Sequence, residues 1–282
     1  MDIKHGDDTP GECVSGHRGG GIDFRHLLIG REGAKDNHHL SMWRENGGFF
    51  SPRHRHNFDQ IRICLEGEVS VTPDQTIRPG GIGYFPEGVA YGPQDSKVPS
   101  LGVVMQFGGA SGDGFVSFRQ MAEAFSALKQ QGTFEGGVFR RERASTAPGT
   151  KLNQDGYEAI WEHVTGRRLA YPAPRYSAPL VMYPENYAWE EDAAQPGVAR
   201  RHLGTFTERH VELSTLRLGA GASCAMPART GVRVYFALSG TGSAGDQAYR
   251  ALSAWETAPG EPLTLRADTP SEIFVAGLPI FS

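Results

Sequence analysis

The stretch GFFSPRHRHNFDQIRICLEG, residues 48–67, places two histidines at alternate positions just before a run with the pattern of a β-strand. His54 and His56 are two residues apart, so in an extended chain both side chains point to one face. Gln60 begins the second run, in which apolar and more polar residues alternate over residues 60–65. We therefore predict strands whose inner face carries both histidines.

The alternation in the second run assigns its two faces. Ile61, Ile63 and Leu65 lie on one face and suit packing away from the histidines. The other face carries Gln60, Arg62 and Cys64, so it shares the predicted interior with the histidine pair. An arginine inside a small barrel is costly unless an anion meets it. Arg62 is therefore a candidate anchor for a substrate carboxylate or enolate, and the alternative is a salt bridge to a neighbouring Asp or Glu.

Nine positions in this part of the chain follow a fixed spacing, in two groups: Gly48, His54, His56, Gln60 and Gly67, then Gly80, Pro86, Gly88 and Tyr91. This spacing resembles the two signature motifs of the cupin superfamily over roughly residues 35–108. The sequence departs from the motifs twice. Gln60 stands where the family has Glu, and Tyr91 stands where it has a third histidine.

The resemblance implies a divalent metal ion held by His54, His56 and Gln60. Fe(II) is favoured, and Mn(II), Ni(II) or Zn(II) also suit these ligands. Tyr91 would either bind the metal or face it as a proton donor. No carboxylate matches the motif, so the triad of two histidines and one carboxylate is not evident. The alternative is a pocket in which the histidine pair hydrogen-bonds a ligand directly.

The second half of the chain repeats the glycine spacing of the first half. Gly221 follows Gly48 by 173 residues, and Gly260 follows Gly88 by 172. A nearly constant offset indicates a duplicated domain. The whole chain therefore resembles a bicupin, a protein with two cupin barrels.

The second copy has lost every ligand position of the first copy. Pro227 and Leu263 cannot coordinate a metal, and Arg229 and Arg233 would repel one. We predict that the second barrel is degenerate, metal-free and structural. The alternative is an anion site built from Arg229 and Arg233.

The predicted fold is all-β, with two cupin-type (jelly-roll) barrels joined by a helical connector. Apolar residues at helical spacing predict helices over 115–132 and 153–166. Four segments follow from these patterns: a flexible N-terminal tail (1–22), the first barrel with the candidate active site (23–110), a helical and Pro/Tyr-rich connector (111–198), and the degenerate second barrel (199–282).

Composition narrows the class of partner. The 282-residue chain has a net charge of −4, which argues against nucleic acid or an anionic membrane as the main partner. No apolar run approaches the ~20 residues of a membrane span, and no signal peptide is evident. Three cysteines in no metal-binding pattern are typical of a cytoplasmic protein with reduced thiols. The resemblance also suggests a homodimer.

The cupin resemblance implies a broad range of functions. Our first hypothesis is a metal-dependent enzyme, an oxygenase acting on a small organic acid or on an enolisable or aromatic substrate. A metal-dependent lyase, isomerase or cyclase is the alternative within the same class. A metal-free protein that binds a small ligand is the alternative outside it.

Overall fold

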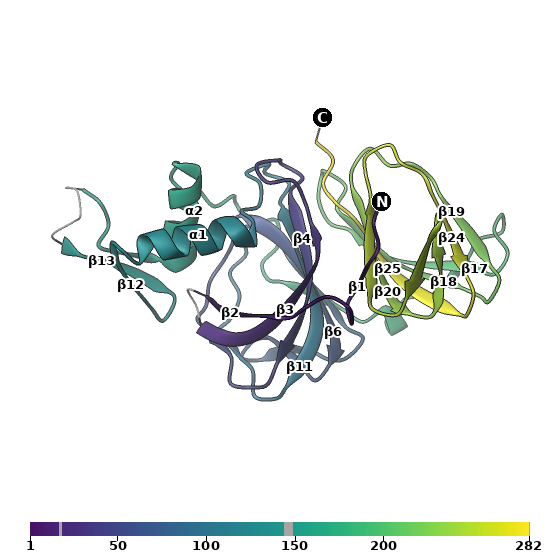
Figure 1. The fold of residues 1–282 in the computed structure, drawn as a ribbon, viewed down its shortest axis with the longest axis horizontal. Coiled ribbons are helices and arrows are strands. Elements are labelled where there is room, and N and C mark those ends of the chain that lie inside the picture. Colours follow the sequence, from purple (N-terminus) through teal and green to yellow (C-terminus); the bar gives the residue numbers. More distant parts are fainter. Residues whose placement is uncertain (17–18, 144–148, 282) are drawn as a thin grey trace.

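Two seven-stranded antiparallel sheets form the frame of the computed structural model, which describes residues 1–16, 19–143 and 149–281. The first sheet has the order β15-β9-β6-β11-β4-β3-β2 and belongs to the first barrel (Figure 1). Two short ribbons, β10-β5 and β7-β8, complete that barrel. Its strands are β2 (Glu12–Gly16), β3 (Gly19–Ile29), β4 (His38–Glu45), β5 (Phe50–Ser51), β6 (Phe58–Glu66), β7 (Val69–Thr72), β8 (Gln75–Ile77), β9 (Ile82–Phe85), β10 (Gln94–Asp95), β11 (Ser100–Gly108) and β15 (Leu180–Met182).

The second barrel combines the sheet β1-β23-β20-β25-β18-β17-β16 with the four-stranded sheet β19-β24-β21-β22. Its strands are β1 (Lys4–His5), β16 (Glu190–Glu191), β17 (Val198–Thr205), β18 (Glu212–Leu218), β19 (Ser223–Met226), β20 (Arg233–Ser239), β21 (Thr241–Ala244), β22 (Gln247–Arg250), β23 (Ser253–Thr257), β24 (Leu263–Ala267) and β25 (Ser271–Gly277). The predicted all-β fold with two barrels is confirmed.

Strand β6 shows the alternation that the sequence predicts. Ile61 and Ile63 are buried in a hydrophobic cluster that also contains Val234 and Phe236 of the second barrel. The apolar face of β6 therefore packs against the second barrel. Its other face, which carries Arg62, points into the first barrel.

Aromatic rings fill the interior of the second barrel. Trp255 stacks on Tyr235 with ring centroids 5.4 Å apart, and Tyr249 stacks on Trp255 at the same distance. All three side chains are buried. This packing fills the interior of the second barrel with apolar rings, and the structural role of that barrel stays a prediction.

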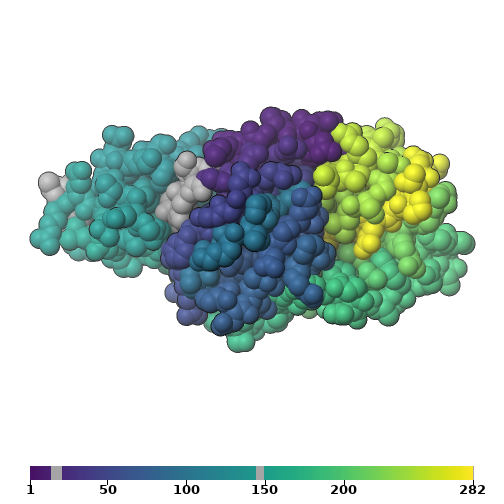
Figure 2. Space-filling model, turned by 90° about the horizontal axis from the view of Figure 1, so that it is seen from below, coloured from purple at the N-terminus to yellow at the C-terminus, as the bar shows by residue number. Residues whose placement is uncertain are grey.

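The N-terminal segment was expected to be a flexible tail over residues 1–22, and the structure contradicts this. Strand β1 pairs with β23 of the second barrel, with Lys4 opposite Ala254, and strand β2 pairs with β3 of the first barrel. Figure 2 shows this purple segment reaching the yellow-green second barrel. The segment is polar and rich in glycine, and β23, the partner of β1, lies far away in the sequence. Composition alone therefore could not reveal the pairing.

The connector contains both predicted helices, α1 (Phe118–Leu128) and α2 (Gly156–Thr165). Ser117 caps α1 in a capping box, and Asp155 caps α2. Between the helices lies an unpredicted three-stranded sheet of β12 (Gly132–Glu135), β13 (Val138–Arg141) and β14 (Asn153–Asp155), and a short 3-10 helix η2 (Pro184–Asn186) follows later.

The connector does not form a separate body over residues 111–198. Its strand β15 joins the first sheet, and β16 joins the second. The helices α1 and α2 lie against the first barrel, on the side away from the second barrel (Figure 1). No helix in the described ranges is long and apolar enough to cross a membrane.

Candidate active site in the first barrel

A cavity of about 480 Å³ opens into the first barrel, and four of the predicted site residues line it: His54, His56, Gln60 and Arg62. The fifth, Tyr91, is buried directly behind the histidines. A pair of backbone hydrogen bonds joins His54 and Tyr91, at 3.0 and 2.9 Å. The structure therefore brings together all five residues that the motif spacing selected.

Hydrogen bonds orient the two imidazoles. His54 Nδ1 lies 2.6 Å from the carbonyl oxygen of Pro52 and donates to it, since a carbonyl can only accept. His54 Nδ1 therefore carries a proton, which leaves Nε2 as the ring atom for a metal ligand when the imidazole is neutral. His56 Nδ1 lies 3.2 Å from the Tyr91 hydroxyl. The two rings are close to one another, with centroids 5.0 Å apart.

Aromatic side chains hold the His56 ring in place. It stacks on Phe58 at 4.4 Å, and the edge of Tyr157 meets it at 4.9 Å. The Tyr157 hydroxyl in turn donates to Asn57 Oδ1 at 2.6 Å. Tyr157 belongs to α2, so the helical insert helps to position a residue of the motif.

Gln60 and Arg62 contact one another inside the cavity. With its carbonyl oxygen toward Arg62, Gln60 accepts hydrogen bonds from Nε at 2.9 Å and from Nη2 at 3.0 Å. We adopt this orientation because the opposite one would set the amide nitrogen, a donor, against the guanidinium, which has only donors. The Gln60 nitrogen then lies 2.8 Å from the Gln106 amide.

Arg62 has no carboxylate partner among the residues that the structure describes. Its guanidinium lies over the rings of Phe85, at 4.7 Å, and Tyr91, at 5.6 Å. Burial lowers the pKa of Arg62, and the interaction of Arg62 with Tyr91 partly opposes this shift. Within the described residues, the salt bridge that the sequence allowed as an alternative is therefore not formed. The cavity contains a partly buried cation, and the acceptors that contact it in this part of the chain are neutral side chains.

The donor set can be compared with what a divalent metal requires. The two imidazoles fit such an ion, because each has its Nδ1 engaged with an oxygen of the protein. The described residues contain no group of three or more His, Cys, Asp or Glu side chains that could hold a metal. Gln60 is the remaining protein ligand, and it fits only when its carbonyl oxygen turns away from Arg62.

A buried acidic pair that the motif analysis missed flanks the site. Asp59, just before Gln60, accepts from the Tyr84 hydroxyl and from the backbone N–H of Glu87, both at 2.8 Å. Burial raises the pKa of Asp59 to about 7. Only 1% of Glu87 is exposed, and this residue directly follows Pro86 of the second motif. The pair therefore joins the two segments that carry the site.

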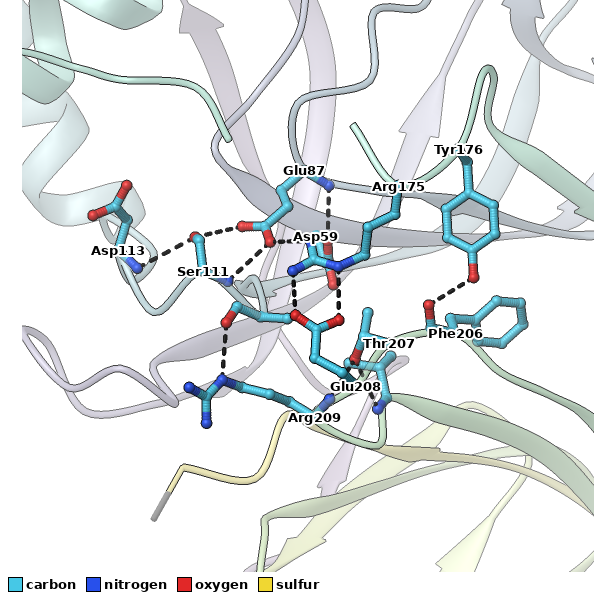
Figure 3. A network of polar contacts seen from close by, with 12 residues as sticks. Asp59, Glu87, Ser111, Asp113, Arg175, Tyr176, Phe206, Thr207, Glu208 and Arg209 are labelled. Carbon is cyan, nitrogen blue, oxygen red and sulfur yellow. Dashed lines mark hydrogen bonds and ion pairs between the residues drawn. The ribbon is translucent and has the colours of Figure 1, made fainter. Parts of the chain in front are cut away.

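Arg175 of the connector links this acidic pair to the second barrel (Figure 3). Its Nη1 donates to Glu87 at 2.6 Å, and its Nε donates to Glu208 at 2.8 Å. Next to Glu208, Arg209 donates to the Ala110 carbonyl of the first barrel at 2.9 Å. The second barrel and the connector thus brace the motif segments of the first.

Arg229 and Arg233, the two candidates for an anion site in the second barrel, donate hydrogen bonds within the protein. Arg229 donates to Glu212 at 3.2 Å and to the carbonyl oxygens of Leu278 and His210, at 2.7 and 2.6 Å. Arg233 donates to the Pro227 carbonyl at 2.8 Å. These contacts give both residues a structural role and do not favour the alternative anion site.

Comparison with known proteins supports the fold. No family model and no curated protein matches the sequence. A candidate dioxygenase from Nostoc punctiforme is 12% identical with a TM-score of 0.62, over 99% of this chain and 82% of that protein. Oxalate decarboxylase from Bacillus subtilis is also 12% identical with a TM-score of 0.58, over 100% of this chain and 77% of that protein. At such identities the likeness concerns the fold alone: this chain has the all-β architecture of two cupin-type barrels.

Proposed function

We propose that the first barrel is the active site of a metal-dependent enzyme that acts on a small organic acid. The observation that carries this proposal is the juxtaposition of Arg62 and the imidazoles of His54 and His56 in one cavity, where Arg62 is a partly buried cation with no carboxylate partner among the described residues. A cavity with such a cation and two oriented imidazoles suits an anionic substrate that reacts beside a metal.

Each residue has a role in this proposal. His54 and His56 would hold the metal, and Gln60 would add a carbonyl oxygen. When bound, the metal acts as a Lewis acid that stabilises negative charge on the substrate. Arg62 binds the substrate carboxylate with two parallel hydrogen bonds and releases Gln60 as it does so. Tyr91, hydrogen-bonded to His56 Nδ1, keeps that ring oriented and can exchange a proton with it.

Within this class we favour an Fe(II)-dependent oxygenase, because one structural neighbour is described as a candidate dioxygenase. A lyase that removes carbon dioxide is the alternative, because another neighbour is named for decarboxylating oxalate. Mn(II), Ni(II) and Zn(II) suit the same two imidazoles.

A second candidate function is a metal-free protein that binds small acids. The observation that favours it is the contact between Arg62 and Gln60, because this contact engages the Gln60 carbonyl oxygen that would otherwise be the third protein ligand of a metal. In this case the imidazoles would hydrogen-bond the acid directly, and the site would bind its ligand without turnover.

Metal content separates the two candidates. We expect about one divalent ion per chain in protein purified without an affinity tag, because two imidazoles and an amide oxygen form a partial coordination shell that substrate or water completes. His56→Ala should lose this metal. The matched control is His163→Ala, which removes an exposed histidine on α2 and should retain the metal. The measurement is inductively coupled plasma mass spectrometry.

The opposite outcome is equally clear. If the wild type holds no metal after incubation with Fe(II), Mn(II), Ni(II) and Zn(II) but still binds carboxylates, the metal-dependent enzyme is excluded and the binding protein remains. If His56→Ala and His163→Ala retain equal amounts of metal, the ion lies elsewhere.

A further inference from the structure

The cavity extends well beyond the predicted site residues, and helix α1 forms one of its walls. Apolar side chains from three parts of the chain line this wall: Phe24 of β3, Phe118, Met121, Ala122 and Phe125 of α1, and Ile160 of α2. The α1 residues have the spacing i, i+3, i+4, i+7, so they form one stripe along the helix.

This stripe borders the face that anchors α1. Ala124 and Leu128 are buried in a cluster with Phe139 and Ile160, and Met121 and Phe125 of the stripe pack against the edge of that cluster. Phe118 and Phe125 remain partly exposed, although they are large and apolar. Large apolar side chains that stay partly exposed inside a cavity are typical of a ligand-binding wall.

The apolar wall meets the barrel beside the polar site. The ring of Phe118 lies 4.4 Å from the ring of His39, edge to face. His39 is opposite Gln106 in the sheet, and Gln106 is opposite Gln60. Arg62 is two residues further along the same face, opposite Val104. A molecule lying along α1 would therefore have one end at Arg62.

Two acidic side chains, Glu12 and Glu45, also line the cavity, and Glu12 lies opposite Phe24 at the edge of the sheet. The Glu45 carboxylate accepts from the backbone N–H of Phe49 at 3.2 Å and from the Ser100 hydroxyl at 3.5 Å. Ser41 and Arg62 lie in one cross-strand row, because both are paired with Val104 of β11. Glu45 is four residues from Ser41 along β4, so it lies roughly 13 Å from that row. Arg62 can therefore meet an anion without close repulsion from this acid.

We infer that the substrate is a carboxylic acid with an aromatic body, bound with the carboxylate at Arg62 and the ring along the α1 wall. This inference rests on the proposed function for the role of Arg62 and adds the class of substrate. An acid of two or three carbons would leave most of the 480 Å³ unfilled. Aromatic side chains on the wall offer edge-to-face contacts to a ring.

Three probes test the two halves of the inference: naphthylacetate, acetate and naphthylethanol. We expect naphthylacetate to bind at least about tenfold more tightly than acetate, which lacks the ring, and than the alcohol, which lacks the charge. Dissociation constants are measured by calorimetry on the full chain, once loaded with metal and once after a chelator. Equal affinity of naphthylacetate and acetate overturns the aromatic body, and equal affinity of naphthylacetate and naphthylethanol overturns the anchor.

Two variants with the same new residue test the position of the wall. Ala122 is exposed to the cavity, so Ala122→Trp fills it without removing a packed side chain. Glu123→Trp places the same residue at the next position, which is exposed and does not line the cavity. We expect Ala122→Trp to weaken naphthylacetate binding by about tenfold or more, and Glu123→Trp to leave it unchanged. Equal binding by both variants would overturn the assignment of the α1 wall.

These outcomes are separable from those of the proposed function. Binding of naphthylacetate by metal-free protein, weakened in Arg62→Gln, would support the inference even if no metal were ever found. A stoichiometric metal without any preference for the aromatic acid would keep the enzyme and exclude this substrate class.

Discussion

Replacing Arg175 with methionine is expected to lower the free energy of unfolding by about 3 kcal/mol, because it strands a carboxylate inside the protein. Glu87 is almost fully buried and would keep only its hydrogen bonds from Ser111, at 2.9 Å for the backbone donor. Asp59 is buried nearby, so two acids would face one another without a cation. The Arg175 side chain is 26% exposed, so we expect a loss of stability at the lower end of the range that is typical when one partner of a buried ion pair is removed.

Chemical denaturation with urea measures this loss, and Arg217→Met is the matched control. Arg217 pairs with Glu191 at 2.8 Å, but both side chains are exposed. An exposed pair contributes less than about 1 kcal/mol, so the same substitution there should change little. If both variants lose equal stability, Arg175 does not act as a brace between the connector and the two barrels.

The motif residues could be predicted from the sequence because their arrangement depends on local geometry. Both His54 and His56 line the cavity, as the spacing of two residues predicts, although the strand expected there is absent: they lie between β5 and β6, where His54 forms an isolated bridge to Tyr91. The alternation in β6 likewise separates Arg62 from Ile61 and Ile63, which the structure confirms. A spacing of two residues also places Gln60 beside Arg62, but their hydrogen bonds depend on which side chains surround them.

The contacts that brace the site could not be predicted in this way. Glu87 is 28 residues from Asp59, Arg175 is 88 residues from Glu87, and Glu208 is 33 residues further on. No periodicity links residues at such separations. Asp59 is fully buried, but neither the motif spacing nor the strand alternation marks it as a residue of the site.

The prediction of a flexible tail at the N-terminus is wrong for a related reason. The composition of this segment resembles that of a disordered tail, and β1 consists of only two paired residues. What orders the segment is the exposed edge of β23, which a strand can cover with backbone hydrogen bonds whatever its side chains are. The polarity of residues 1–22 was therefore a poor guide to their order.

The second large effect is a loss of stability as the pH falls. Between about pH 7 and pH 4, the wild type is expected to lose about 3 kcal/mol more stability than His39→Gln. Burial, together with the nearby His26 and His38, lowers the pKa of His39 to about 3. The imidazole therefore stays neutral in the folded chain, while the unfolded chain binds a proton below about pH 6.5. Stability is lost as the pH falls from about 6.5 toward 3.

Comparison with a variant is necessary because other groups act in the opposite direction. Burial raises the pKa of Asp59 to about 7, and Glu256 raises the pKa of His38, so both groups bind protons more readily in the folded chain. Their contributions to stability grow as the pH falls and oppose the loss at His39. They are shared by the wild type and His39→Gln, so they cancel in the difference between the two urea midpoints. An exposed substitution, His163→Gln, should give a curve parallel to the wild type. If the stability of His39→Gln also changes with pH in parallel with the wild type, then His39 gains its proton in the folded chain. The inference that Phe118 packs against a neutral imidazole would then be wrong.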